Sequence, residues 1–437
     1  MQNPQTQNSG LPISIPSAAD GKRVWLRVGT LIDGESSLPI RNAHIVYDAA
    51  SILYVAGDAN HPPASLLNFG QSLPDLDLPD FTLLPGLIEA HAHIFLEGGE
   101  LDSERRAANL KKHLASLVEE AGRKLERIAR LGVIGVRDAG DRMGVGLALS
   151  KSYSRGENPV MPYFDSPGAA IHHKGAYGGF MADPVEDFLS PEECVRSRLR
   201  KGADRIKLIV SDVIDFRSGR VIKTPQMSAE EVEKLVAASR ENGKQTFAHA
   251  TGDLGIENAI MGGVDSIEHG FFIRNDQLER MRDREIAWVP TFSPVQKQVE
   301  FADRMGWDQK VVSNLRRILD QHSASLLKAD KIGVKIIAGS DAGALGVPHG
   351  FGLIDELCLM ENAGLSSLSV LRSAAGTSSS RLGFKEKFGL IKPGYQSRII
   401  LTQHSPVESV SNLKREKYVI FDGKLLSNGE SINLDGL

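Results

Sequence analysis

The feature that most constrains the fold is a regular alternation of short apolar runs with helical segments between residues 81 and 383. Apolar residues recur at a 3.6-residue spacing over residues 110–128, a pattern that predicts a helix with one buried face. Ser190 and Ser228 are each followed three residues later by Glu, which predicts two further helix starts. Because strands that alternate with helices pair in parallel, the middle of the chain is predicted to be an α/β domain.

Eight short apolar runs in this middle region are candidate strands. They lie at residues 81–87, 132–137, 160–164, 205–210, 245–248, 264–268, 286–290 and 335–338. Eight strand–helix repeats in about 300 residues have the size of a (β/α)8 barrel of the TIM type, which we predict here. A doubly wound open sheet is the alternative architecture.

Both ends of the chain are rich in short strands separated by turn residues. The candidate strands lie at residues 24–28, 43–46 and 52–56, and again at 396–401, 418–422 and 424–427, with Asp422-Gly423 as a hairpin turn. We expect the two ends to form one small β-sandwich module. The predicted divisions are a disordered or mobile tail (1–20), the first part of the module (21–80), the barrel (81–383) and the second part of the module (384–437).

Composition excludes several classes of protein. The 437 residues include 51 basic and 55 acidic ones, and the net charge of −4 gives no electrostatic attraction to nucleic acid or to an anionic membrane. The two cysteines, Cys194 and Cys358, are too few for a disulfide framework or a Cys-rich zinc module. No apolar run reaches the roughly 18 residues of a membrane span, and residues 1–21 lack the features of a secretory signal. A cytoplasmic location is therefore expected.

Polar residues stand at the carboxyl ends of the candidate strands. His91 and His93 are two residues apart, so on a strand both imidazoles would project from the same face. Lys207 lies inside an apolar run, and its two interpretations are an edge-strand lysine that reaches solvent and a lysine carbamylated by carbon dioxide.

Three further side chains follow later strands. His249 and His269 would each, taken alone, be a core histidine, and Asp341 could cap the next helix. In a barrel, however, the carboxyl ends of all strands converge on the face where active sites lie. We therefore predict a metal site formed by His91, His93, Lys207, His249, His269 and Asp341.

Several blocks together resemble the amidohydrolase superfamily, and within it the imidazolonepropionase and Xaa-Pro dipeptidase group. The blocks are PGLIEAHAH (residues 85–93), GADRIK (202–207), GVDSIEHG (263–270), GSDAG (339–343) and KPG (392–394), and the resemblance runs from about residue 24 to 423.

The resemblance implies a site with two divalent metal ions, usually zinc. His91, His93 and Asp341 would hold one ion, His249 and His269 the other, and carbamylated Lys207 would bridge them. A metal-bridging hydroxide would attack an amide bond, with Asp341 moving the proton to the leaving nitrogen. A single-metal site, in which Lys207 stays an ammonium, is the alternative.

The resemblance implies that the loop after the third candidate strand contacts a small-molecule substrate; the alternative is a surface loop with incidental polar residues. His173 is a candidate donor to the oxyanion and therefore a catalytic candidate beside Asp341, whereas His172, Lys174 and Tyr177 are candidates for substrate binding. The stretch His172-His173-Lys174 departs most from the family pattern.

His349, after the last strand, is a further substrate-facing candidate. His61, His113, His322 and His404 are expected at the surface.

These observations predict a metal-dependent amidohydrolase acting on dipeptides or N-acyl amino acids with a free carboxylate, and relatives suggest a homo-oligomer. One alternative is a hydrolase of cyclic amides or of foreign amides and carbamates, resembling phenylurea or ochratoxin hydrolases. Another is a catalytically silent barrel that serves as an interaction module.

Overall fold

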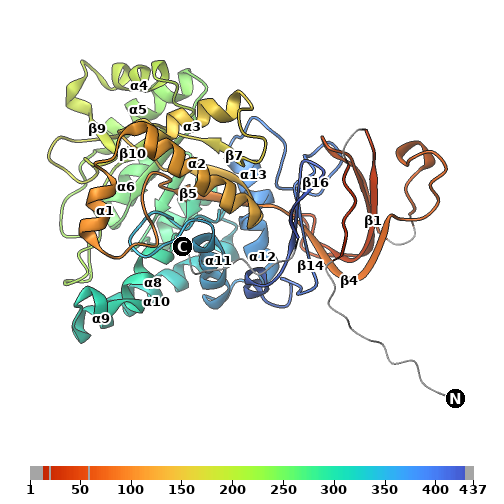
Figure 1. Cartoon of the computed structure of the whole chain (residues 1–437). Helices are drawn as coiled ribbons and strands as arrows, with labels where there is room; N and C mark the ends of the chain where they lie inside the picture. Colours follow the sequence, from red (N-terminus) through yellow and green to blue (C-terminus); the bar gives the residue numbers. More distant parts are fainter. Residues whose placement is uncertain (1–12, 19–20, 58–59, 429–437) are drawn as a thin grey trace.

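The computed structural model describes residues 13–18, 21–57 and 60–428. Parallel strands surrounded by helices form the larger part, and a sheet built from both chain ends lies beside it (Figure 1). The mixed α/β architecture with parallel sheets confirms the predicted fold class at this level.

The central strands form two parallel sheets, with the orders β13-β12-β11-β10-β8-β9 and β5-β6-β7. The strands are β5 (Leu87–Ala92), β6 (Val133–Asp138), β7 (Tyr163–Asp165), β8 (Ala170–His172), β9 (Ala182–Pro184), β10 (Ile206–Ile209), β11 (Thr246–Ala250), β12 (Ser266–His269) and β13 (Ala287–Val289). Residues 335–338 link the outer strands of the two sheets, because Ile337 N–H donates to Trp288 C=O of β13 (2.9 Å) and Ala90 N–H of β5 donates to Ala338 C=O (3.0 Å).

Two of the expected strands differ from the prediction. Residues 81–87 do not form one barrel strand: β4 (Leu76–Pro85) belongs to the sheet of the chain ends, and β5 begins at Leu87. The break falls at Gly86, where an added Cβ would lie 2.2 Å from the side chain of Ile134, so the chain passes too close for any larger residue. The run at 335–338 forms only an isolated bridge, between Ile336 and Trp288.

Helices separate the central strands, as the alternation predicted. They are α1 (Ser103–Asn109), α2 (Leu114–Arg130), α3 (Val145–Ser154), α4 (Pro191–Arg200), α5 (Ala229–Glu241), α6 (Asp253–Gly262), α7 (Asn275–Asp283), α8 (Ser293–Glu300), α9 (Ala302–Met305), α10 (Gln309–Ile332), α11 (Phe351–Asn362), α12 (Ser367–Ser373) and α13 (Gly376–Arg381), with short 3-10 turns η1 (Ala64–Leu66), η2 (Val185–Asp187) and η3 (Val410–Lys414). Ser190 and Ser228 accept hydrogen bonds from the backbone N–H groups of Glu193 and Glu231, which confirms both predicted helix starts.

The two chain ends share one seven-stranded sheet of order β16-β15-β14-β4-β1-β2-β3. Its other members are β1 (Val24–Leu31), β2 (Ile40–Tyr47), β3 (Ile52–Ala56), β14 (Ile399–Thr402), β15 (Tyr418–Phe421) and β16 (Lys424–Asn428). The predicted hairpin turn is confirmed, with positive φ at Asp422 (49°) and Gly423 (72°) between β15 and β16.

Part of the expected mobile tail packs on this sheet: Ile15 and Ala18 are buried, and Ala18 N–H donates to Gly423 C=O. The rest of that tail, residues 1–12 and 19–20, lies outside the described residues.

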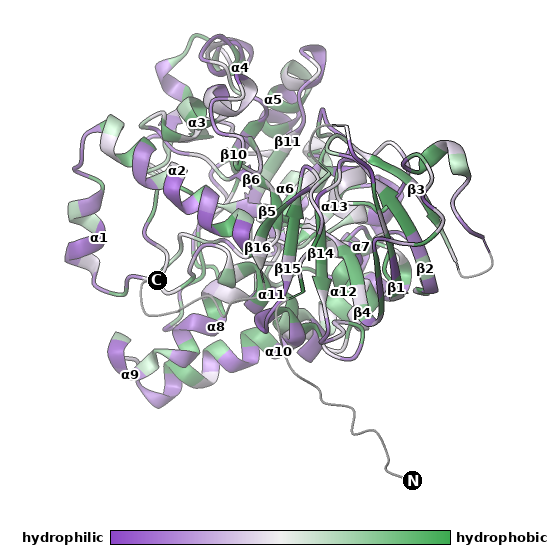
Figure 2. Cartoon of the chain, turned by 45° about the vertical axis from the view of Figure 1, so that its right-hand side comes forward, coloured by the Kyte–Doolittle hydropathy of each residue, from purple (hydrophilic) through white to green (hydrophobic). Residues whose placement is uncertain are grey.

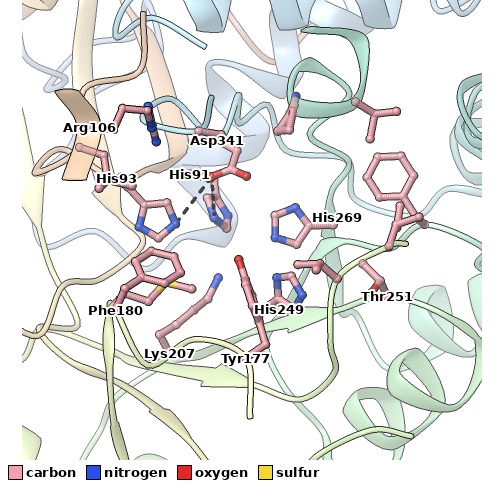
Figure 3. A pocket seen from close by; sticks show the side chains of 18 of the residues that line it. His91, His93, Arg106, Tyr177, Phe180, Lys207, His249, Thr251, His269 and Asp341 are labelled. Atoms are coloured by element: carbon pink, nitrogen blue, oxygen red, sulfur yellow. Dashed lines mark ion pairs between the residues drawn. The ribbon is translucent and has the colours of Figure 1, made fainter. Parts of the chain in front are cut away.

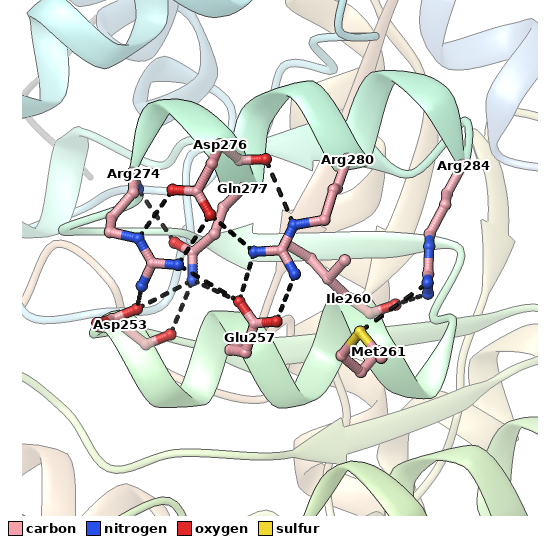
Figure 4. Close-up of polar contacts among 9 residues, drawn as sticks. All are labelled: Asp253, Glu257, Ile260, Met261, Arg274, Asp276, Gln277, Arg280 and Arg284. Atoms are coloured by element: carbon pink, nitrogen blue, oxygen red, sulfur yellow. Dashed lines mark hydrogen bonds and ion pairs between the residues drawn. The ribbon is translucent and has the colours of Figure 1, made fainter.

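The strands carry mainly apolar residues, whereas the helices turn hydrophilic residues outward (Figure 2). On one outer face an ion-pair network joins α6 to α7, with Glu257 bound by Arg280 and Arg274 bound by Asp276 (Figure 4). No helix in the described ranges is both long and apolar enough to cross a bilayer.

Candidate metal centre and active site

The six predicted ligands converge on one cavity of 420 Å³ at the carboxyl ends of the central strands (Figure 3). His91 lies on β5, Lys207 on β10, His249 on β11 and His269 on β12. His93 follows β5, Asp341 follows the extended residues 335–338, and backbone hydrogen bonds tie the two segments together. His93 N–H donates to Ala342 C=O (2.7 Å), and Asp341 N–H donates to His91 C=O (2.8 Å).

The side chains point at one another closely enough to share ions. Asp341 Oδ1 lies 3.7 Å from His91 Nε2 and 3.6 Å from His93 Nε2. Single ligand atoms of His91, His269 and Asp341 all lie within 4.8 Å of one another. The ring centroids of His249 and His269 are 4.6 Å apart. Such spacing suits imidazole nitrogens and a carboxylate oxygen that surround a divalent cation.

Three of the four imidazoles are held in orientation by contacts of Nδ1, on the side of the ring opposite Nε2. This atom lies 2.6 Å from Glu268 Oε2 in His91, 3.1 Å from Gly140 O in His93 and 2.7 Å from Thr291 Oγ1 in His269. A proton on Nδ1 that serves these acceptors leaves the lone pair of Nε2 free to face the cavity.

Two buried polar atoms in the cavity have no hydrogen-bond partner in the described part of the chain: Lys207 Nζ and His249 Nε2. An unpaired buried donor or acceptor is costly, so both atoms fit groups that bind something else. Burial lowers the pKa of Lys207 to about 8 and the pKa values of His93 and His249 to about 3. The histidines are therefore neutral at pH 7, as metal ligands must be.

The backbone is strained at this end of the strands. His269, Thr291 and Asp341 have positive φ values of 68°, 49° and 57°. For residues other than glycine this conformation costs on the order of 1 kcal/mol or more each. Strain concentrated at candidate ligands and at the partner of His269 is typical of a functional site.

The sequence interpretation missed the pair that supports His91. Glu268 is fully buried and accepts hydrogen bonds from Arg137 Nη2 (2.8 Å) and Ser266 Oγ (2.6 Å) besides its contact with His91. Arg137 Nε also donates to Ala90 C=O (2.6 Å). The available signal in the sequence was a charged residue inside each of two apolar strands.

The cavity wall beyond the ligands is mostly apolar. Its apolar residues are Leu96, Ala107, Leu110, Phe180, Met181, Val213, Ile214, Phe216, Phe271, Pro294, Val295 and Ala344. Arg106 of α1 is the sole arginine among the lining residues, and it lies on the Asp341 side (Figure 3). Its guanidinium donates to Glu97 C=O and to Gly343 C=O (2.8 Å), which fixes its position. Neither Arg106 nor the wall was identified from the sequence, because both depend on how loops fold over the strands.

Of the predicted substrate residues, only Tyr177 lines this cavity. His173 lies between two carboxylates, with Nδ1 2.7 Å from Glu186 and Nε2 2.9 Å from Glu231, so it has no ring nitrogen left for an oxyanion. His172 is buried outside the cavity lining and Lys174 is exposed.

His349 also lies outside, in a smaller neighbouring cavity, where Nε2 contacts Leu96 C=O at 3.0 Å. His322, expected at the surface, is buried and stacked on Phe271 with ring centroids 4.0 Å apart.

The chain belongs to the amidohydrolase family, whose model matches residues 82–426. It is accordingly a hydrolase acting on carbon–nitrogen bonds, as predicted. A curated relative, ochratoxinase of Aspergillus niger, is 25% identical over 96% of this chain and 90% of its own length.

The crystal structure of a Xaa-Pro dipeptidase with bound methionine is also similar, with a TM-score of 0.77, 28% identity and coverage of 92% of this chain and 99% of that one. The crystal structure of A. niger ochratoxinase has a TM-score of 0.76 and 25% identity, and covers 94% of this chain and 97% of that one. These likenesses confirm the superfamily and group that the sequence blocks indicated.

Proposed function

We propose that this protein is a metal-dependent hydrolase of small amides that carry a bulky apolar group and a carboxylate, such as N-acyl amino acids or dipeptides. The observation that supports it most is the pair of unsatisfied buried atoms, Lys207 Nζ and His249 Nε2, inside a cavity lined by three more imidazoles and Asp341. Groups so arranged fit bound cations, because neither atom has a hydrogen-bond partner among the described residues.

The donor set suits two ions, for which zinc is our proposal. His91, His93 and Asp341 would hold one ion, His249 and His269 the other, and Lys207 would bridge them as a carbamate. The lowered pKa of the buried Lys207 amine favours this, because carbon dioxide adds to the neutral amine. Bound divalent ions would lower the pKa of a water molecule to about 7 and polarise the scissile carbonyl.

Asp341 is the proposed proton carrier. Burial raises the pKa of its carboxyl to about 7, although Lys207 opposes this. In this proposal the Asp341 carboxylate accepts a proton from the attacking water and returns it to the leaving nitrogen. Its position between His91 and His93 brings it to the reacting atoms.

The cavity suggests the substrate class. A volume of 420 Å³ accommodates a substrate of amino-acid to dipeptide size, and the aliphatic and aromatic wall favours an apolar side chain or acyl group. Arg106 supplies the guanidinium that we propose for a substrate carboxylate. The same apolar wall, together with the similarity to ochratoxinase, favours a foreign aromatic amide as the second candidate substrate.

Metal analysis combined with a substrate screen tests the proposal. We expect about two equivalents of metal per chain and amine release from apolar N-acyl amino acids, but not from their carboxamide analogues. Lys207→Ala should lose at least one equivalent and the activity, whereas Lys201→Ala, at the exposed carboxyl end of α4, should change neither. A protein without stoichiometric metal would support the silent interaction module instead. One equivalent with an uncarbamylated Lys207 would support the single-metal site.

The proposal includes four further statements about the protein. The parallel strands close into a (β/α)8 barrel, the chain ends form a β-sandwich module with the predicted domain limits, the protein is a homo-oligomer, and it is located in the cytoplasm.

A further inference from the structure

Tyr177 reaches the metal-ligand cluster from the loop between β8 and β9. Its hydroxyl points toward the space enclosed by His91, His249 and His269 (Figure 3). The ring packs against that of His249, with centroids 5.3 Å apart, and its outer side faces Phe180 at 6.1 Å. The hydroxyl makes no hydrogen bond within the described residues, whereas the neighbouring Thr251 hydroxyl already donates to Asp212 C=O (2.6 Å).

The loop holds this side chain in place from several directions. Gln226 Nε2 donates to Tyr177 C=O (3.2 Å), and Gln226 Oε1 accepts from His173 N–H (2.8 Å). His173 in turn contacts Glu186 and Glu231. Gly178, with φ of 108°, lets the chain pass so close to Ile209 that an added Cβ would lie 3.2 Å from that side chain. A fixed donor of this kind needs no reorganisation during a reaction.

We propose that Tyr177 is the oxyanion donor of this hydrolase, the role that sequence reasoning gave to His173. The inference rests on the proposed function. As water attacks the carbonyl carbon, a C–O bond forms and the π pair of C=O moves to oxygen. Tyr177 Oη–H donates a hydrogen bond to that oxygen and keeps its proton, because burial raises the pKa of this phenol above its ordinary value near 10. When the C–N bond breaks, an electron pair of the oxyanion re-forms the C=O bond. The nitrogen leaves with the C–N bonding pair and takes up the proton carried by Asp341.

Geometry favours Tyr177 over the other donors near the cavity. Both ring nitrogens of His173 contact carboxylates outside it. Arg106 is held by backbone carbonyls on the Asp341 side. Tyr177 approaches from the opposite side, near Lys207 and His249 (Figure 3). A carbonyl placed between Asp341 and Tyr177 would therefore have its leaving nitrogen near the proton carrier and its oxygen near the phenol.

The test compares Tyr177→Phe with wild type and with Tyr54→Phe, which removes a hydroxyl bonded to Asn60 C=O far from the cavity. The probes are N-acetyl-L-phenylalanine as substrate, N-methylphosphonyl-L-phenylalanine as a tetrahedral mimic and L-phenylalanine as product. Kinetics gives kcat and KM, calorimetry gives both dissociation constants, and elemental analysis gives the metal content.

For Tyr177→Phe we expect kcat to fall by about 10²–10³-fold with KM nearly unchanged. The phosphonate should bind more weakly by a similar factor, L-phenylalanine should bind within twofold of wild type, and metal content should stay constant. The inference is wrong if kcat falls less than threefold, if phosphonate and product weaken alike, or if metal is lost together with activity. Wild-type protein without metal or turnover would instead contradict the proposed function.

Discussion

Substitution of Glu268 tests whether a buried ion pair stabilises the fold and supports the candidate metal ligand His91. Glu268 is fully buried, and its carboxylate is the only negative partner within salt-bridge distance of Arg137 in the described part of the chain. Glu268→Gln keeps the shape and one acceptor oxygen but removes the charge. Since the Arg137 guanidinium is only 1% exposed, it would remain buried as an uncompensated cation. Breaking a buried pair in this way costs about 3–5 kcal/mol, and the remaining amide oxygen places this case near 3 kcal/mol.

The same change should weaken metal binding. The Glu268 carboxylate lies 2.6 Å from His91 Nδ1 and so fixes the ring with Nε2 toward the cavity. Loss of such a supporting carboxylate typically lowers metal affinity by about 10–100-fold. Zinc competition against a fluorescent chelator measures this effect, and urea unfolding of the metal-free protein measures the loss of stability.

A double variant separates the two effects. Arg137→Met with Glu268→Gln removes both charges, so most of the lost stability should return while zinc affinity stays low. Glu233→Gln, at an exposed position of α5, serves as the matched control and should change neither quantity. If Glu268→Gln lost less than about 1 kcal/mol, the argument from the buried charge would fail. Unchanged zinc affinity would show that His91 needs no support from Glu268.

Three further predictions concern other parts of the molecule. Burial lowers the pKa of His322 from 6.5 to about 4, so its stabilising effect is complete above pH 6.5 and is lost as the pH falls toward 4. When the pH falls from 7 to 5, the free energy of unfolding of the metal-free wild type should decrease by about 2 kcal/mol more than that of metal-free His322→Gln, as measured by urea unfolding. Glu257→Gln should cost less than about 1 kcal/mol, with a smaller loss in 1 M salt and constant metal content, because the α6–α7 network is partly exposed. Phe180→Ala should raise KM for N-acetyl-L-phenylalanine roughly tenfold with little change in kcat, whereas an equal fall in kcat would contradict a role in binding alone.

The candidate ligands could be predicted because each lies within or shortly after an apolar run, and parallel strand order brings such positions together. His249 and His269, for example, lie at the carboxyl ends of β11 and β12, which pair in parallel from Phe247 with Ser266 to Ala250 with His269. Tyr177 and Arg106 could be placed only by the structure, since their reach depends on loop conformations that no periodicity describes.

His322 is a different kind of miss. It occupies the position expected for an apolar residue in the stripe Val311, Leu315, Ile318, His322, Leu326 and Ala329 of α10, and all six are buried. The 3.6-residue spacing was present in the sequence and indicated burial. The residue type, a histidine, favoured the surface, whereas its position in the apolar stripe favoured burial.

The arrangement around the cavity also explains why its ligands come from so many strands. Four imidazoles, an amine and a carboxylate within one cavity would compete for protons and repel one another when charged, so no short segment could hold them together. Here the groups come from several segments, with His91 and His93 both at the end of β5, and the polar atoms behind them belong to still other elements, such as Thr291 after β13 and Gly140 after β6. Folding therefore supplies the energy that gathers groups unable to assemble alone, and bound cations would then satisfy the nitrogens that the protein leaves unpaired.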